Sequence, residues 1–149
     1  MNTEEIIELG SAHLIRFCER LPLAPVRGKG SYLWDADGKK YLDFVSGIAV
    51  NSLGHCHPKV VEAIKEAAGD LLHCSNLYNI EGQARLAAFL ADKTGLDKAF
   101  FANSGAEANE AAIKLARRYV KLFVSEERFE VITAEHSFHG RTLATMTAT

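Results

Sequence analysis

One stretch near the end of the sequence limits what this chain can fold into. The apolar run KAFFAN at residues 98–103 precedes a long helical pattern that begins at Ser104, and a second apolar run, RFEVITAE at residues 128–135, follows it. Strand, helix and strand in this order form a βαβ unit with parallel strands and a right-handed crossover. The sequence therefore predicts an α/β fold.

The region before this unit predicts helices and one hairpin. Residues 3–20 have a helical pattern that Pro22 and Pro25 would end. Residues 31–44 hold two β-rich runs around Asp37-Gly38, a pair favoured in tight turns, and predict a β-hairpin. Residues 45–57 are small and glycine-containing, and they are interpreted as a connector.

Two further helices are expected between the connector and the βαβ unit. Pro58 suits the first turn of a helix over residues 58–72. A second helix is expected from about Ile80 to Lys93, with Gly95 as its C-terminal stop. Residues 141–149 fit a helix or a strand equally well. One βαβ unit has too few strands for a stable open sheet, so the sequence is interpreted as cut in mid-domain, with exposed apolar surface.

Composition excludes several classes of protein. A chain of 149 residues with 48% hydrophobic and 24% charged residues suits a soluble globular protein. A net charge of −2 gives no nucleic-acid or membrane surface. Three widely spaced cysteines argue against a disulfide framework, and the acidic start MNTEEIIELG is unlike a signal peptide, so a cytoplasmic location is expected. The His55-Cys56-His57 cluster fits no usual zinc spacing, and no metal site is predicted.

The start of the long helix has the features of an anion site. Ser104 is a good N-cap, and Glu107 three residues later completes a capping-box pattern. The first N–H groups of a helix lack helical partners, and Gly105 and Ala106 have almost no side chain to keep a phosphate away from them. The P-loop pattern is absent. A helix cap without a ligand is the other interpretation of the same residues.

A second candidate element follows the second apolar run. In open α/β sheets ligands bind at the carboxyl ends of strands, where both Ser104 and Phe138 would fall. Phe138 could stack on a flat ring, and Arg141 could hold a carboxylate in a bidentate contact. Core packing for Phe138 and a solvated surface charge for Arg141 are the alternatives. Two candidate ligand elements at the same sheet edge favour a binding site.

These residues resemble those of a known family. The stretches FANSGAEANEAAIKLARRY and HSFHGRTLATMTAT, with SYLWDADGKKYLDFVSGIAVNSLGHCHPKVVEAI before them, closely resemble the class III, fold-type-I aminotransferases that use pyridoxal 5'-phosphate. Within that family the strongest resemblance is to the acetylornithine aminotransferases, and it covers essentially the whole chain. It implies that residues 1–50 are the N-terminal segment of the small domain. It also implies that residues 51–149 are the first part of the cofactor-binding large domain.

The resemblance also implies roles for particular residues. Ser104, Gly105 and Ala106 would bind the cofactor phosphate, Phe138 would cover one face of its pyridine ring, and Arg141 would bind the substrate carboxylate. Two further segments are implied: Ser46–Val50 near the substrate pocket and Asn76–Tyr78 near the dimer interface. In the family, the Schiff-base lysine and the acidic partner of the pyridine nitrogen come from positions beyond Thr149, so no catalytic residue is assigned here.

The function implied is amino-group transfer between N-acetylornithine and 2-oxoglutarate in arginine biosynthesis, carried out by a homodimeric enzyme of which this chain is the N-terminal part. Three alternatives remain open from the sequence. The first is another class III aminotransferase, acting on ornithine, succinylornithine or 4-aminobutyrate. The second is a non-catalytic fragment, and the third is a stand-alone phosphate-binding module.

Overall fold

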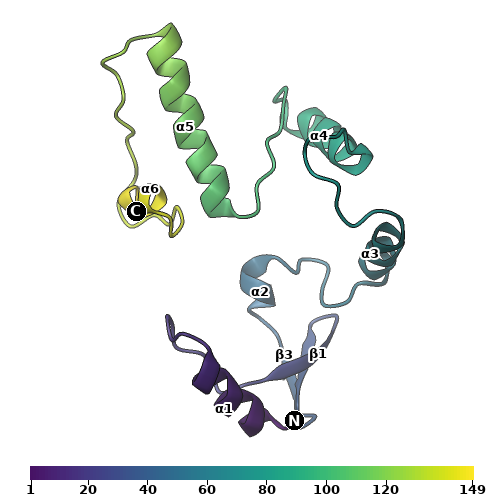
Figure 1. Ribbon diagram of the computed structural model, residues 1–149. Coiled ribbons are helices and arrows are strands. Elements are labelled where there is room, and N and C mark those ends of the chain that lie inside the picture. The colour runs from purple at the N-terminus through teal and green to yellow at the C-terminus, as the bar shows by residue number, and fades with distance from the viewer. The chain divides into compact units, whose positions relative to one another are not determined.

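The computed structural model describes all 149 residues, which divide into two compact units, Met1–Ser75 and Asn76–Thr149. The first unit contains a small antiparallel sheet and three helices, and the second contains helices only (Figure 1). The elements of the first unit are α1 (Thr3–His13), β1 (Pro25–Lys29), β2 (Tyr32–Asp35), β3 (Lys40–Leu42), α2 (Ser46–Ala49) and α3 (Pro58–Asp70). Those of the second are α4 (Glu81–Thr94), α5 (Gly105–Phe123) and α6 (Leu143–Thr147).

The predicted hairpin is confirmed and is part of a three-stranded sheet. The strands β2 and β3 pair antiparallel on either side of the Asp37-Gly38 turn, where Gly38 has a φ of 84° and its N–H donates to the Asp35 carbonyl at 3.1 Å. The first strand, β1, pairs antiparallel with β2, with an irregularity between Pro25 and Arg27. The sequence pattern did not predict β1, because PVRGK lacks apolar alternation. Its proline and glycine suit an edge strand.

A buried carboxylate organises the hairpin turn. Asp35 accepts a hydrogen bond from the Tyr41 hydroxyl at 2.7 Å and from the backbone N–H groups of Lys39 and Asp37 at 2.8 and 3.0 Å. The bond from Tyr41 is the main cause that lowers the pKa of Asp35 below its ordinary value of 3.8, and the two backbone bonds add to it. The same contact raises the pKa of Tyr41 above 10.0. The turn therefore depends on an ionised Asp35.

This dependence predicts acid sensitivity of the hairpin. A carboxyl with a lowered folded-state pKa adds stability above its unfolded pKa of 3.8, and this contribution is lost as the pH falls through the lower folded value. Between pH 6 and pH 3, the thermal midpoint of the wild type should therefore fall more than that of Asp35→Asn. Asp37→Asn is the matched control, because it keeps a turn-forming pair with Gly38 and none of the three bonds involves its side chain. An equal acid response in Asp35→Asn and the wild type would contradict the assignment.

The connector over residues 45–57 contains a left-handed turn, α2. Ser46, Gly47, Ile48 and Ala49 all have φ between 52° and 65°, which costs about 1–2 kcal/mol for each residue other than glycine. Asp43 holds this turn: its Oδ1 accepts from the N–H groups of Val45 and Ser46 at 2.9 Å each, and its Oδ2 lies 2.6 Å from His55 Nε2. The bond from Ser46 N–H, followed by that from His55, lowers the pKa of the Asp43 carboxyl.

Three helix predictions meet different outcomes. Both α3, with Pro58 in its first turn, and α4, ended by Gly95 at φ 72°, lie where the sequence placed them. The prediction of one helix over residues 3–20 was wrong at its C-terminal end, because α1 ends at His13 and Leu14 is extended. The apolar residues Ile15 and Phe17 are exposed, so no packed face supports further helical turns there.

The predicted βαβ unit is only partly present. The helix is confirmed as α5, but residues 98–103 and 128–135 form no strand, and the only sheet is the antiparallel one in the first unit. A strand requires a hydrogen-bonded neighbour, and neither segment pairs with the other. Their apolar side chains are exposed, Phe100 by 74% and Ile132 by 99%. The ambiguous C-terminal segment forms α6.

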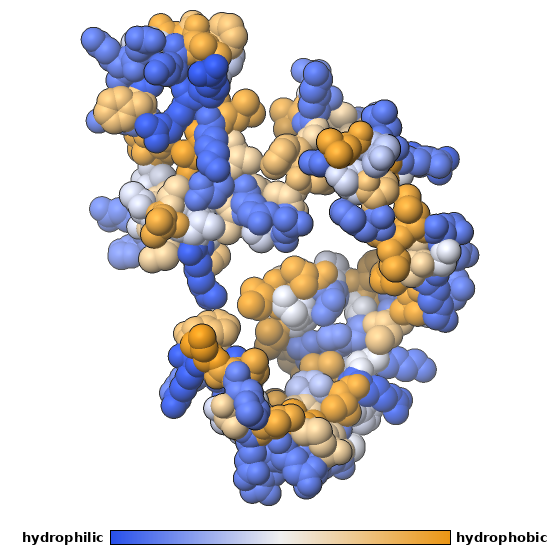
Figure 2. Space-filling model, viewed as in Figure 1, coloured by the Kyte–Doolittle hydropathy of each residue, from blue (hydrophilic) through white to orange (hydrophobic).

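The expected exposed apolar surface is confirmed. Ala24 is the only buried apolar residue, and Thr145 is the only side chain with no exposure. Figure 2 shows apolar side chains at the surface among polar ones. None of the helices has the length and apolar character needed to span a membrane.

Candidate active site

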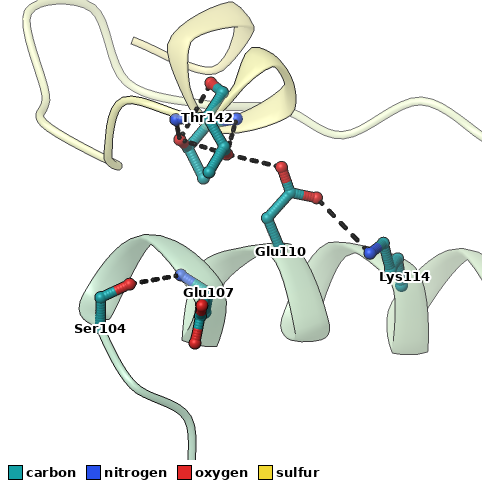
Figure 3. A network of polar contacts seen from close by, with 6 residues as sticks. Ser104, Glu107, Glu110, Lys114 and Thr142 are labelled. Carbon is teal, nitrogen blue, oxygen red and sulfur yellow. Dashed lines mark hydrogen bonds and ion pairs between the residues drawn. The ribbon is translucent and has the colours of Figure 1, made fainter.

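The start of α5 presents free backbone donors. Ser104 is the N-cap, in extended conformation, and its Oγ accepts a hydrogen bond from Glu107 N–H at 3.2 Å (Figure 3). The predicted reciprocal capping box is half present, because the Glu107 carboxylate accepts from Asn103 N–H at 2.7 Å and not from Ser104 N–H. Glu107 reaches one residue further back along the chain and so satisfies the backbone before the cap.

The space around these donors suits an anion. The first helical hydrogen bond of α5 runs from Ala108 N–H to the Ser104 carbonyl at 3.0 Å. The N–H groups of Gly105 and Ala106 come before it and therefore have no helical partner. A Cβ placed on Gly105 would meet no atom within 4 Å, so open space lies beside the donors. The Ser104 hydroxyl accepts from Glu107 and keeps its own proton to donate. The residues present therefore fit a phosphate group.

The loop after residue 135 lies against the first turns of α5. Gly140 is buried with a φ of 134°, and a Cβ there would lie 2.7 Å from both Ala106 Cβ and Thr145 Oγ1. Asn109 Nδ2 donates to the His139 carbonyl at 2.7 Å. In Figure 1, the chain after α5 returns alongside this helix to α6, near the helix start. The structure thus brings together the two candidate elements, the α5 start and the residue 138–141 loop.

A polar network closes the same region. The Thr142 hydroxyl donates to Glu110 Oε1, and Thr142 is also the N-cap of α6, where its side chain and that of Thr145 form a capping box (Figure 3). The second oxygen of Glu110 lies 3.9 Å from Lys114 Nζ. Sequence reasoning missed Asn109, Glu110 and Thr142. The Thr-x-x-Thr spacing was a signal for the α6 cap, but no local pattern marks a contact across about thirty residues.

Phe138 and Arg141 lie on the exposed side of this loop. Phe138 is 73% exposed, and the Arg141 guanidinium carbon lies 5.8 Å from the centre of its ring. Arg141 forms no ion pair with any carboxylate of the chain, so its donors are available to a ligand. Of the other segments implied by the resemblance, Ser46–Val50 includes α2 of the first unit, and Asn76–Tyr78 begins the second.

Comparison with known proteins identifies the family. Residues 17–149 match the family model of the class III aminotransferases, and the chain belongs to this family. Enzymes of the family use pyridoxal phosphate. It is 53% identical over 149 residues to the acetylornithine aminotransferase of Methanocaldococcus jannaschii, covering all of this chain and 37% of that protein. The chain thus spans little more than a third of the length of this curated relative.

Solved structures show the same relationship. An (S)-enantioselective omega-transaminase from Thermomicrobium roseum superposes with a TM-score of 0.91 at 32% identity, over 100% of this chain and 36% of that one. A taurine:2-oxoglutarate aminotransferase from Bifidobacterium kashiwanohense, in complex with PLP and glutamate, gives 0.86 at 32% identity, over 97% of this chain and 32% of that one. The backbone of this chain therefore matches about one third of a fold-type-I aminotransferase.

The close approach of Gly140 to α5 predicts a specific intolerance. Gly140→Ala should lower the free energy of unfolding by about 1–3 kcal/mol, because its Cβ collides with Ala106 and Thr145 and its φ is unfavourable for alanine. Gly82→Ala in α4 is the control, because a Cβ there meets no atom within 4 Å. Urea unfolding measures the free energy of unfolding of both variants. It is carried out on the full polypeptide, that is, the whole natural protein that contains this sequence. Equal stability of the two variants would contradict the close approach.

Proposed function

We propose that this chain is the N-terminal part of an acetylornithine aminotransferase, which moves an amino group between N-acetylornithine and 2-oxoglutarate in arginine biosynthesis. The observation that carries the proposal is the 53% identity to the Methanocaldococcus jannaschii acetylornithine aminotransferase over all 149 residues. The arrangement of donors, ring and guanidinium on α5 and the following loop supports it.

In this proposal the α5 start binds the phosphate of pyridoxal 5'-phosphate. The N–H groups of Gly105 and Ala106 and the Ser104 hydroxyl donate to the phosphate oxygens, and the helix dipole adds about 0.3–1 kcal/mol for one charge. Phe138 covers one face of the ring and excludes water from it. When bound, the cofactor withdraws electrons from the reacting carbon of the substrate.

Arg141 holds the substrate carboxylate. Its guanidinium offers parallel donors that match a carboxylate in bidentate geometry, and no carboxylate of the chain competes for it. Its contact with the Phe138 ring keeps the guanidinium beside the surface that would cover the cofactor. This placement would orient a carboxylate-bearing amino donor with respect to the ring.

Other parts of the proposal concern the longer protein. The lysine that binds the cofactor covalently and the acidic partner of its ring nitrogen lie outside these residues, and the enzyme is a homodimer. Residues 1–50 belong to the small domain, and residues 51–149 begin the large one. A cytoplasmic location stays a prediction from the spacing of Cys18, Cys56 and Cys74, all of which are free thiols.

Cofactor binding is tested at Gly105. Gly105→Val should weaken pyridoxal-phosphate binding by the full polypeptide about tenfold or more, because the side chain fills the open space beside the phosphate donors. Binding is measured by cofactor absorbance during titration of the apoprotein. Gly69→Val, in α3 where a Cβ also meets nothing within 4 Å, controls for the general effect of valine in a helix. Equal affinities in both variants would contradict the phosphate site.

Substrate choice is tested with a panel of amino donors. The full polypeptide should turn over N-acetylornithine with a higher kcat/KM than ornithine, succinylornithine or 4-aminobutyrate, with 2-oxoglutarate as acceptor. Arg141→Leu should raise the KM for the carboxylate-bearing donor about 10–100-fold, because a charge-assisted bidentate contact is lost. A preference for another donor would refute the first part, and an unchanged KM would refute the role of Arg141.

A different amino donor is the runner-up function. The superposition on a taurine:2-oxoglutarate aminotransferase and on an omega-transaminase favours it, because proteins with the same backbone arrangement accept different donors. The same donor panel distinguishes the two proposals. A non-catalytic fragment predicts no turnover and no borohydride-reducible lysine adduct with pyridoxal phosphate.

A further inference from the structure

We infer that Asn109 and Glu110 of α5 are positioning residues that fix the loop carrying Phe138 and Arg141 in its working position. This inference rests on the proposed function, because it assigns these two neighbours to the same site. Neither residue is assigned a contact with the cofactor or the substrate. Each holds the loop by one hydrogen bond, Asn109 through the His139 carbonyl and Glu110 through the Thr142 hydroxyl.

The two hydrogen bonds flank Arg141, the proposed carboxylate-binding residue, along the chain. Gly140 and Arg141 are the only residues between His139 and Thr142, so the backbone of Arg141 is tied to α5 on both sides. Phe138 immediately precedes the first tie. Gly140 packs against Ala106, one of the proposed phosphate donors. The first two turns of α5 thereby hold the phosphate site, the ring-covering residue and the carboxylate-binding residue together.

The bond from Thr142 to Glu110 also sets the orientation of the Thr142 hydroxyl. A hydroxyl has one proton to donate and two lone pairs to accept with. Because the Thr142 hydroxyl donates its hydrogen bond to Glu110, its lone pairs face other donors, and Thr145 N–H donates to Thr142 Oγ1 at 3.4 Å. Glu110 therefore supports the N-cap of α6 as well as the loop, and Thr145 beneath it is completely buried.

An ordinary helix-surface ion pair does not account for Glu110. Its partner Lys114 is 3.9 Å away with a side chain 78% exposed, and exposed pairs of this kind contribute little. The Glu110 side chain is only 21% exposed, and its other oxygen accepts a hydrogen bond from the Thr142 hydroxyl. A carboxylate acceptor in a partly buried position makes the stronger bond. The dominant contact of Glu110 is thus with the loop.

The test compares four variants of the full polypeptide. Asn109→Asp removes the donor to His139 and places a carboxylate oxygen against the carbonyl, and Glu110→Leu removes the acceptor for Thr142. Glu110→Gln keeps an acceptor, and Lys114→Gln is the control on the same helix. The measurements are kcat and KM for N-acetylornithine, the absorbance of bound pyridoxal phosphate, and hydrogen exchange of the backbone over residues 136–145.

The inference predicts a split that a merely structural role would not produce. Asn109→Asp and Glu110→Leu should raise the KM about tenfold, shift the cofactor absorbance and speed exchange in the loop, with a smaller change in kcat. Glu110→Gln should recover most of the KM, and Lys114→Gln should match the wild type. Lower thermal stability with unchanged KM and absorbance in the first two variants would overturn the inference.

Failure of the proposed function gives a different result. If the wild type binds no pyridoxal phosphate and turns over none of the donors, the proposed function is wrong, whatever the variants do. Hydrogen exchange then decides the geometry by itself. Faster exchange over residues 136–145 in Asn109→Asp and Glu110→Leu, with wild-type exchange in Glu110→Gln, supports the attachment of the loop, and equal exchange in all variants overturns it.

Discussion

The contact between Gly140 and Ala106 is the constraint on which the candidate site depends. Only a residue without a Cβ can lie this close to α5, and the backbone at Gly140 has a φ of 134° that glycine tolerates best. The close approach brings the His139 carbonyl within reach of Asn109 and the Thr142 hydroxyl within reach of Glu110. A larger residue at either position would separate the loop from the helix, and the proposed ring and carboxylate contacts would no longer share one frame with the phosphate donors.

The first unit uses carboxylates for a comparable purpose. Asp35 satisfies two backbone N–H groups in the hairpin turn, and Asp43 satisfies two at the left-handed turn that follows β3. In each case a side chain supplies a second contact, Tyr41 to Asp35 and His55 to Asp43. Because the ionised form accepts all these bonds, the pKa of both carboxyls is lowered. The hairpin turn and the left-handed turn are thus each held by a carboxylate that is largely shielded from solvent.

The sequence predicted best those features that depend on neighbouring residues. Pro58, Gly95 and Ser104 mark helix ends through the chemistry of their own side chains or backbone, and the structure has helix ends at all three. The strands over residues 98–103 and 128–135 were predicted wrongly, because apolar content indicates burial in a sheet but does not supply the hydrogen-bonded neighbour. The end of α1 was wrong for a related reason, since Ile15 and Phe17 have no surface to pack on. Asn109 and Glu110 could not be found, because their partners lie about thirty residues away and no spacing rule connects them.

The balance of local and non-local interactions also explains how the site relates to the whole protein. Caps and turn contacts contribute about 1 kcal/mol each, whereas ordering the backbone of one residue costs about 1–2 kcal/mol. Burial of apolar surface normally offsets that cost, yet Ala24 is the only buried apolar residue here. The chain spans 37% of the length of its Methanocaldococcus relative. Under the proposed function, contacts with the remainder of a longer polypeptide would supply the missing burial. Residues 104–145 would then determine the local geometry of the site, and the residues that pack over them would supply its rigidity.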